Sequence, residues 1–302
     1  MKLLIINNIK SGLQDGAIFD FIRLVSQDGD EACLRTTDGA TRIESLLHDA
    51  QDFDAVVVSG GDGSIAAAAY ALANTHVPLL PYPAGTANLL AENLSSPLEP
   101  NSLAKLLKSG RYLDFDLGEI TARDQTFGFC IMAGAGYDAT IMNGAKPNKK
   151  LLGPMAYFQA AFSNPSPQVS KIALEIDGKR HESEGLGILL VNFSKIQFDI
   201  TVTHDNLPRD GLFDIVILKA ENAFGLIPAV LAGIRDREGY YPDRGESLEI
   251  FRGREVHVEC DPPMHIEYDG DLPGLDTPFF ARALPQAARF IVSEEAYREF
   301  AE

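Results

Sequence analysis

The chain has 302 residues, of which 45% are hydrophobic and 23% charged, the proportions of a globular protein with room for one large domain or two. Its formal net charge of −17 argues against nucleic acid as a partner, because phosphate binding needs clustered Lys and Arg. The same charge disfavours adsorption to anionic membranes. No apolar run approaches the roughly 20 residues that span a bilayer.

The cysteines and the first residues indicate a compartment. Cys33, Cys130 and Cys260 are far apart, have no CxxC spacing and sit in or beside apolar runs, so we expect buried, reduced thiols. The apolar part of residues 1–8 is too short for a signal peptide. We therefore expect a cytoplasmic protein without a transmembrane segment.

Strands and helices alternate over the first 110 residues. This order predicts a Rossmann-like parallel sheet with helices on both faces. The predicted strands are 2–6, 31–35, 55–59 and one that starts at 77, and the predicted helices are 15–26, 40–49 and 101–109.

The turn after the third strand carries the first candidate site. Gly60 and Gly61 stand where the chain turns, where glycine tolerates a positive φ and lets the backbone approach a ligand. We expect Ser64 to cap the following helix, whose positive end attracts anions. Asp62 lies between them, and an acid beside a phosphate requires a cation, so the pattern favours magnesium-bound phosphate. An ordinary glycine-rich turn is the alternative.

A second turn of the same kind follows. Residues 77–91 contain a strand, a proline-bounded turn, and Gly85 and Thr86 at the start of another helix. In an open parallel sheet, loops of this kind lie together at the carboxyl edge, where ligands bind. Two adjacent loops with Gly, Ser or Thr, and Asp or Asn therefore predict a nucleotide site.

The pattern changes after Gly110, where strands dominate and few helices appear. Asp177-Gly178 is a hairpin signal, and the whole region predicts an antiparallel β-sandwich. We expect two domains, 1–117 and 118–302, with the last helix packing back on the first. The predicted strands are 113–120, 126–133, 169–176, 184–192, 212–218, 247–260 and 264–269, and the predicted helices are 151–163, 222–234 and 294–301.

Gly60-Gly61-Asp62-Gly63-Ser64 and Pro83-Ala84-Gly85-Thr86-Ala87-Asn88 together resemble the catalytic signature of the diacylglycerol kinase superfamily. The match is closer to its soluble bacterial lipid kinases, which are related to sphingosine and ceramide kinases. NAD kinases share a similar first motif. The resemblance extends from Asn7 to about Val292, and it implies a nucleotide-binding α/β domain followed by a β-sandwich domain, with the site in the cleft between them.

The resemblance also implies roles for single residues. Asp62, Asp269 and Asp271 are the implied catalytic residues, where Asp271 replaces the usual Glu and Asp269 or Asp271 is the candidate base. Asp210 is the implied side-chain ligand of a structural Mg²⁺, together with carbonyl groups near Leu207 and Leu212. The implied nucleotide contacts are Asn7, Gly60, Gly61, Gly63, Ser64, Gly85, Thr86 and Asn88.

The chain departs from the family pattern at several positions. Asn8 replaces a proline, and Leu89 replaces an acid, which indicates a change of subfamily. Residues 193–207 lack the family's glycine pairs, and His204 in this segment is a weak acid–base candidate. Basic residues gather at 146–150 and 235–254, and a solvated surface explains them better than membrane docking.

These observations predict an ATP-dependent, Mg²⁺-requiring lipid kinase that phosphorylates a diacylglycerol- or sphingoid-like hydroxyl at a membrane surface as a peripheral protein. A kinase for a soluble acceptor such as NAD is the alternative that the acidic charge favours. A non-catalytic nucleotide-binding regulator is the third hypothesis, motivated by Leu89 and Asp271. Homodimers are common among proteins in general, and nothing in this sequence bears on the oligomeric state beyond that.

Overall fold

The computed structural model describes residues 1–11, 16–136, 168–196, 200–203, 205–220 and 247–301. They divide into two compact units. The first contains Met1–Leu117, Leu207–Asp210 and Leu284–Glu302, and the second contains Gly118–Asn206 and Gly211–Ala283. Two long strands, β5 (Tyr112–Ala122) and β17 (Phe279–Ile291), contribute residues to both units.

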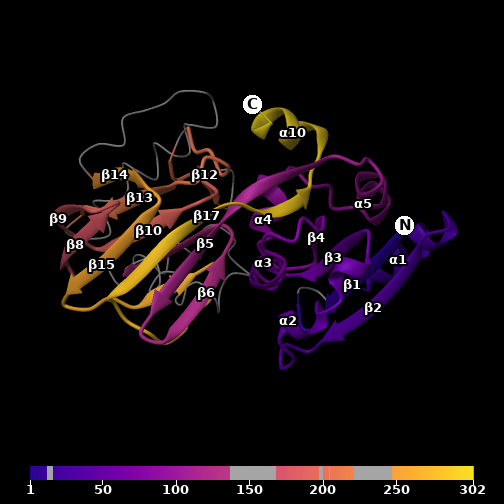
Figure 1. Ribbon diagram of the computed structural model, residues 1–302, viewed down its shortest axis with the longest axis horizontal. Helices are drawn as coiled ribbons and strands as arrows, with labels where there is room; N and C mark the ends of the chain where they lie inside the picture. Colours follow the sequence, from indigo (N-terminus) through magenta and orange to yellow (C-terminus); the bar gives the residue numbers. More distant parts are fainter. Residues whose placement is uncertain (12–15, 137–167, 197–199, 204, 221–246, 302) are drawn as a thin grey trace. The chain divides into compact units, whose positions relative to one another are not determined.

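The first unit is an α/β layer structure. Its parallel strands pair in the order β2-β1-β3-β4, and β17 adds to β4 through Phe290 and Leu79. Figure 1 shows α1 and α5 on one side of these strands and α2 and α3 on the other. The elements are β1 (Lys2–Asn8), α1 (Ala17–Gln27), β2 (Glu31–Thr37), α2 (Ile43–Leu46), a 3₁₀ turn (Ala50–Asp52), β3 (Ala55–Gly60), α3 (Asp62–Ala71), β4 (Leu79–Pro83), α4 (Leu89–Asn93), α5 (Pro100–Leu107) and α10 (Glu294–Phe300).

Hydrophobic periodicity explains this arrangement. The residues of β1 and β3 are buried on both faces, as expected for central strands of a parallel sheet. Helix α1 buries Ile18, Phe21 and Val25, which lie on one face at spacings of three and four residues. Helix α10 starts at the cap residue Ser293, whose hydroxyl accepts a hydrogen bond from the Ala296 N–H, and α10 is part of the first unit.

The second unit is a β-sandwich. One sheet runs β17-β15-β8-β9, with β5 paired to β17 and β6 to β5, and the other runs β14-β13-β10-β7-β16 with antiparallel pairs. This confirms the predicted fold class of an α/β part followed by an antiparallel sandwich. The elements are β6 (Gln125–Phe129), β7 (Met132–Gly136), β8 (Ser170–Ile176), β9 (Lys179–Gly185), β10 (Gly187–Val191), β11 (Lys195–Ile196), β12 (Ile200–Thr201), β13 (Phe213–Leu218), β14 (Leu248–Gly253), β15 (Glu255–Asp261) and β16 (Ile266–Tyr268).

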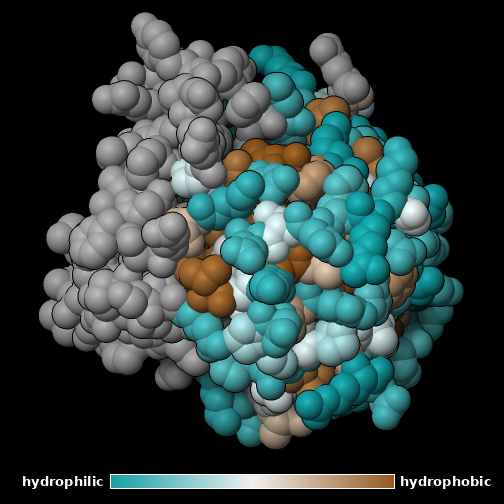
Figure 2. Space-filling model, turned by 90° about the vertical axis from the view of Figure 1, so that its left-hand side faces the viewer, coloured by the Kyte–Doolittle hydropathy of each residue, from teal (hydrophilic) through white to brown (hydrophobic). Residues whose placement is uncertain are grey.

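Alternating side chains build the core of the sandwich. Buried Leu174 and Val258 of one sheet share a hydrophobic cluster with Leu190 and Ile215 of the other. The intervening residues of β8, β9 and β15 are largely charged and exposed. On the face drawn in Figure 2, the coloured residues are mostly hydrophilic, and the apolar ones form small separate patches.

Two predicted strands are each split in the structure, for the same reason. The predicted strand 126–133 divides into β6 and β7 because the N–H groups between them bond to the carboxylate of Asp269. The predicted strand 247–260 divides into β14 and β15 because the N–H groups of Arg254 and Glu255 bond to Asp177. Strand β17 was not predicted.

Other predictions also need correction. Helix α2 is much shorter than the predicted helix 40–49, because the Thr37 hydroxyl donates to the Thr41 carbonyl and accepts from the Gly39 N–H, which closes a turn. Cys33 is exposed on β2, contrary to the expectation of three buried thiols. Cys130 is buried, and burial raises the pKa of the Cys260 thiol to about 11.

Some predicted features lie outside the described residues: the helices 151–163 and 222–234, His204 and most of the two basic groups. Within the described part of the chain, no helix has the length and apolar character needed to cross a membrane.

Candidate active site

The two glycine-containing loops follow neighbouring parallel strands. Gly60, the last residue of β3, is paired in register with Pro83, the last residue of β4. A Cβ atom built on Gly85 would lie only 2.6 Å from the Gly61 Cα. The backbones of the two loops therefore touch, as expected for adjacent loops at the carboxyl edge of a parallel sheet.

Close packing, and not a positive φ, explains Gly60 in the first loop. Gly61 has φ −85° and ψ 176°, which any residue can adopt, and Gly60 is not among the described glycines with positive φ. A Cβ on Gly60 would lie 2.7 Å from the Ser64 Cβ, which leaves no room for a side chain. A positive φ is therefore not the reason for glycine at either position.

Ser64 does not cap α3. The helix starts at Asp62 with Gly61 as its N-cap, and the cap position makes no side-chain hydrogen bond. The Ser64 hydroxyl instead accepts a hydrogen bond from the Asn8 amide at 3.0 Å. Sequence reasoning treated Asn8 only as a lost proline. The polar side chain at that position was the signal that could have found this contact.

Asp62 connects the first loop to the second. Its Oδ1 accepts a hydrogen bond from the Leu90 N–H at 3.0 Å, in the first turn of α4. The second loop is closed by Asn88, whose Oδ1 accepts from the Gly85 N–H at 2.7 Å and whose amide donates to the Gly85 carbonyl at 3.2 Å. Asn88 has φ 55°, a left-handed conformation that Asn tolerates better than most residues.

The other predicted nucleotide contacts lie on the same elements. Asn7 is buried near the end of β1, opposite Ser59 of β3. Gly63 is in the first turn of α3, and Thr86 is exposed in the second loop. The first turn of a helix leaves N–H groups without partners inside the helix and carries a positive partial charge, so these loops suit a bound phosphate.

Asp269 and Asp271 belong to the second unit and flank Gly270 in a tight turn. Tyr268 and Asp271 exchange two backbone hydrogen bonds, at 3.0 and 2.8 Å, across this turn. The carboxylate of Asp269 accepts the N–H groups of three consecutive residues, Cys130, Ile131 and Met132. Asp271 is exposed.

The implied structural magnesium site at Asp210 is not tested by the contacts of the described residues. The Leu207 carbonyl, an implied ligand, accepts the backbone N–H groups of Arg209 at 2.7 Å and Asp210 at 3.3 Å, so it faces its own turn. Among the described residues, no three His, Cys, Asp or Glu side chains gather as a metal site. The implied site has one carboxylate and backbone carbonyls, which the absence of such a cluster does not test. The structural Mg²⁺ at Asp210 therefore stays a prediction, and no step below depends on it.

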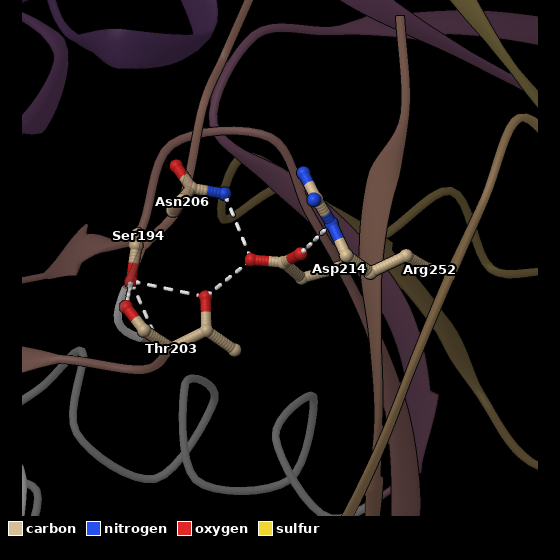
Figure 3. Close-up of polar contacts among 5 residues, drawn as sticks. All are labelled: Ser194, Thr203, Asn206, Asp214 and Arg252. Atoms are coloured by element: carbon tan, nitrogen blue, oxygen red, sulfur yellow. Dashed lines mark hydrogen bonds and ion pairs between the residues drawn. The ribbon is translucent and has the colours of Figure 1, made fainter. Parts of the chain in front are cut away.

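A buried polar network surrounds Asp214, four positions after Asp210 in the sequence, and no sequence pattern indicated it. Figure 3 shows Asp214, only 4% exposed, between Thr203, Asn206 and Arg252. Its carboxylate accepts from the Thr203 hydroxyl at 2.6 Å, the Asn206 amide at 3.0 Å and the Arg252 guanidinium at 3.1 Å. The Ser194 hydroxyl accepts the Thr203 N–H at 2.8 Å. The network anchors parts of the segment that departs from the family pattern, and it accounts for Arg252 structurally.

Two family models cover most of the chain. Residues 2–120 match the diacylglycerol kinase catalytic domain. Residues 132–292 match the YegS C-terminal NAD kinase beta sandwich-like domain.

Several curated proteins are similar to this chain. A diacylglycerol kinase of Mycobacterium tuberculosis is 28% identical over 233 residues, which are 74% of this chain and 72% of that protein. A probable lipid kinase YegS-like of Alcanivorax borkumensis is 28% identical over 279 residues, 88% of each chain. An uncharacterized Synechocystis protein is 26% identical, and the chain spans 55% of its length.

A solved structure supports the fold. The crystal structure of a diacylglycerol kinase from Bacillus anthracis aligns with a TM-score of 0.74 at 19% identity, and the alignment covers 97% of both chains. The motifs, the two-part architecture and the family models agree. The chain therefore belongs to the family that joins a diacylglycerol kinase catalytic domain to a YegS-type, NAD kinase-like β-sandwich domain.

Proposed function

We propose that this protein is an ATP-dependent lipid kinase that transfers the γ-phosphate to the hydroxyl of a diacylglycerol- or sphingoid-like lipid. Membership of the family makes it a phosphotransferase with an alcohol group as acceptor. The observation that carries the proposal is the contact between the Gly61 and Gly85 backbones, which joins two phosphate-type loops at one sheet edge.

Phosphoryl transfer depends on positioning and charge neutralisation more than on covalent chemistry with the protein. In the proposed roles, the backbone of Gly60–Ser64 and the Gly85–Thr86 turn bind the phosphates of magnesium-bound ATP. Asp62 accepts the Leu90 N–H in the first turn of α4, and its carboxylate would supply negative charge to a metal ion bound with the nucleotide. A magnesium ion bound with ATP would offset the repulsion between this carboxylate and the phosphates.

The proposed class of acceptor is inferred from similar proteins. Two of them are named as a diacylglycerol kinase and a lipid kinase, and the proposed site of action is therefore a membrane surface reached from the cytoplasm. A soluble acceptor is the second candidate, because a net charge of −17 weakens attraction to anionic lipid.

The charge of Asp62 provides the sharpest test. Asp62→Asn keeps an oxygen that can accept the Leu90 N–H but removes the negative charge, whereas Asp62→Ala removes both. Asp54→Asn is the matched control, because Asp54 also accepts a backbone N–H, that of Lys2 at 2.7 Å, at the opposite end of β3. We expect Asp62→Asn to lower kcat about 100-fold or more with nearly unchanged thermal stability. Asp54→Asn should keep the activity.

The assay uses radiolabelled ATP, Mg²⁺ and a mixed lipid extract, with NAD as a separate acceptor. Label in the organic phase that Asp62→Asn loses supports the lipid kinase. Label on NAD alone shows a soluble acceptor and overturns the lipid assignment. ATP that raises the melting temperature without product on any acceptor shows a regulatory nucleotide-binding protein.

A further inference from the structure

Asn8, the last residue of β1, is joined by its side chain to the first turn of α3. Its amide nitrogen donates to the Ser64 Oγ at 3.0 Å. Both residues belong to the first unit. Where the family pattern has a proline, this chain therefore has a side chain that contacts the first glycine-containing loop.

A second contact determines the orientation of the Asn8 amide. The Asn8 Oδ1 accepts the backbone N–H of Lys10 at 3.1 Å. Rotating the amide by 180° would place its NH₂ group opposite this N–H, and neither group can accept a hydrogen bond. The oxygen of Asn8 therefore faces Lys10, its NH₂ group faces Ser64, and Asn8 is the donor in the bond to Ser64.

A donor at Asn8 determines how the Ser64 hydroxyl is used. A hydroxyl group has one proton to donate and two lone pairs that accept. The Asn8 amide occupies one lone pair, so the hydroxyl proton of Ser64 points away from Asn8. Among the described residues, Ser64 Oγ is not the donor of any hydrogen bond. Its proton is therefore available to a bound ligand.

The surroundings of Ser64 suit an anion as that ligand. Ser64 is the third residue of α3, and the first turn of a helix carries a positive partial charge. A Cβ built on Gly60 would lie 3.0 Å from the Ser64 Oγ, so the hydroxyl lies directly against the first loop. Ser64 is only partly buried. The proton that Asn8 leaves free is thus beside the proposed phosphate loop.

Asn8 also shapes the loop that follows β1. Its backbone carbonyl accepts the Ser11 N–H at 3.1 Å, and its side chain accepts the Lys10 N–H. A Cβ built on Gly61 would meet the Ser11 hydroxyl at 3.6 Å, so this loop lies against the first glycine-containing loop. A proline would stiffen the loop by fixing φ. In this chain the hydrogen bonds of Asn8 take that part.

We propose that Asn8 is a positioning residue of the nucleotide site, which directs the hydroxyl proton of Ser64 towards a phosphate oxygen of the bound nucleotide. This inference rests on the proposed kinase function, and it adds a residue that the resemblance to the family does not imply. Asn8 acts through Ser64. A carboxylate at position 8 would reverse the hydrogen bond, because a carboxylate only accepts and would take the Ser64 proton for itself.

The test measures the binding of ADP with Mg²⁺ by isothermal titration calorimetry. Asn8→Asp keeps the size of the side chain and the acceptor for the Lys10 N–H, so the loop can still form. We expect the dissociation constant for ADP to rise about 10- to 100-fold, the effect of losing a hydrogen bond to a charged group. Asn74→Asp is the matched control, because it makes the same change at an exposed position beyond the other end of α3. Its affinity should equal that of the wild type.

A second comparison separates the reversed hydrogen bond from the added charge. Ser64→Ala removes the hydroxyl and should weaken ADP binding about 10-fold. When Asn8→Asp is added to Ser64→Ala, only the charge is new, and we expect a further loss of about 2- to 3-fold. An equal effect of Asn8→Asp with and without the Ser64 hydroxyl would overturn the proposal, as would wild-type affinity in Asn8→Asp.

Melting temperatures without nucleotide test for a purely structural role. Asn8→Asp should melt within about 2 °C of the wild type, because its carboxylate can accept both the Lys10 N–H and the Ser64 hydroxyl. A much larger fall, with ADP affinity changed equally in both backgrounds, would make Asn8 a structural residue and not a positioning one.

The calorimetric measurement also separates this inference from the proposed function, because it needs no phosphate acceptor. The expected pattern of ADP affinities in a protein that phosphorylates nothing supports the role of Asn8 and refutes only the proposed function. Phosphotransfer by an Asn8→Asp protein with wild-type affinity refutes only the role of Asn8. A wild type that does not bind ADP overturns both.

Discussion

Gly61 and Gly85 face each other across the two loops, but only one of them has room for a side chain. A Cβ on Gly61 would meet its nearest neighbours, the Ser11 hydroxyl and the Gly85 Cα, at 3.6 and 3.8 Å, which are ordinary contacts. A Cβ on Gly85 would lie 2.6 Å from the Gly61 Cα and 2.9 Å from the Asn88 Oδ1. We therefore predict that Gly85→Ala is destabilising and that Gly61→Ala is tolerated.

The size of the effect follows from these distances. Gly85→Ala requires the backbone at Gly61 to move by about 1 Å, and overpacking of this kind costs about 1–3 kcal/mol. We expect a value near the upper end, because the nearest obstacle is backbone and not the end of a flexible side chain. For Gly61→Ala, lower entropy of the unfolded chain stabilises by about 0.4–1 kcal/mol and loss of the glycine N-cap costs a similar amount. The net change should lie within about 0.5 kcal/mol.

Urea unfolding of the wild type and both variants at one pH measures this difference, and melting temperatures provide a second reading. At about 2–4 °C per kcal/mol, a cost of about 2–3 kcal/mol in Gly85→Ala should lower the melting temperature by about 4–12 °C. Equal losses in the two variants, or a Gly85→Ala protein as stable as the wild type, would show that the two loops do not touch as described.

Two further predictions concern charged groups. Asp214→Ala removes the acceptor of the Thr203 hydroxyl and of the Arg252 guanidinium, and we expect it to lower the free energy of unfolding in urea by about 2–4 kcal/mol. The loss should be smaller than for a fully buried ion pair, because the Arg252 side chain is 44% exposed. A loss below about 1 kcal/mol would contradict the network. Hydrogen bonds from Arg35 lower the pKa of Asp49 from 3.8 to about 2, so the stabilisation from this pair is present above about pH 4 and is lost as the pH falls towards 2. Arg35→Gln should flatten the dependence of unfolding free energy on pH in this window, and an unchanged acid slope would argue against the pair.

Much of the architecture was predictable from local patterns. Apolar β-branched runs such as 55–59, followed by glycine and then a helix, indicated a parallel sheet. Strands of such a sheet are covered by helices on both faces, so their residues are apolar without alternation. Asp177-Gly178 indicated its hairpin, because both residues adopt the positive φ that a two-residue turn needs. The family followed from two motifs and their order.

The proximity of the two candidate loops was predictable from the sequence, but the contacts of their side chains were not. That Gly60–Ser64 and Pro83–Asn88 are neighbouring loops follows from strand order. That Asn8 reaches Ser64, and that Asp62 reaches the Leu90 N–H, depends on side chains that meet across 56 and 28 positions of the sequence. Local propensity contains no information about such pairs.

Sequence patterns were enough to predict the fold class, the family and the two adjacent glycine-containing loops. Each of these depends on patterns within a few turns of chain or on motifs in a fixed order. Only the folded chain shows where the long predicted strands break and which backbone N–H groups Asp177 and Asp269 bind. Strand β6 ends at Phe129 because the next N–H group, that of Cys130, donates to the Asp269 carboxylate, 139 positions away in the sequence. In a continuous strand this N–H group would have paired with a neighbouring strand. Buried backbone donors must find an acceptor, and only the folded chain brings that carboxylate to them.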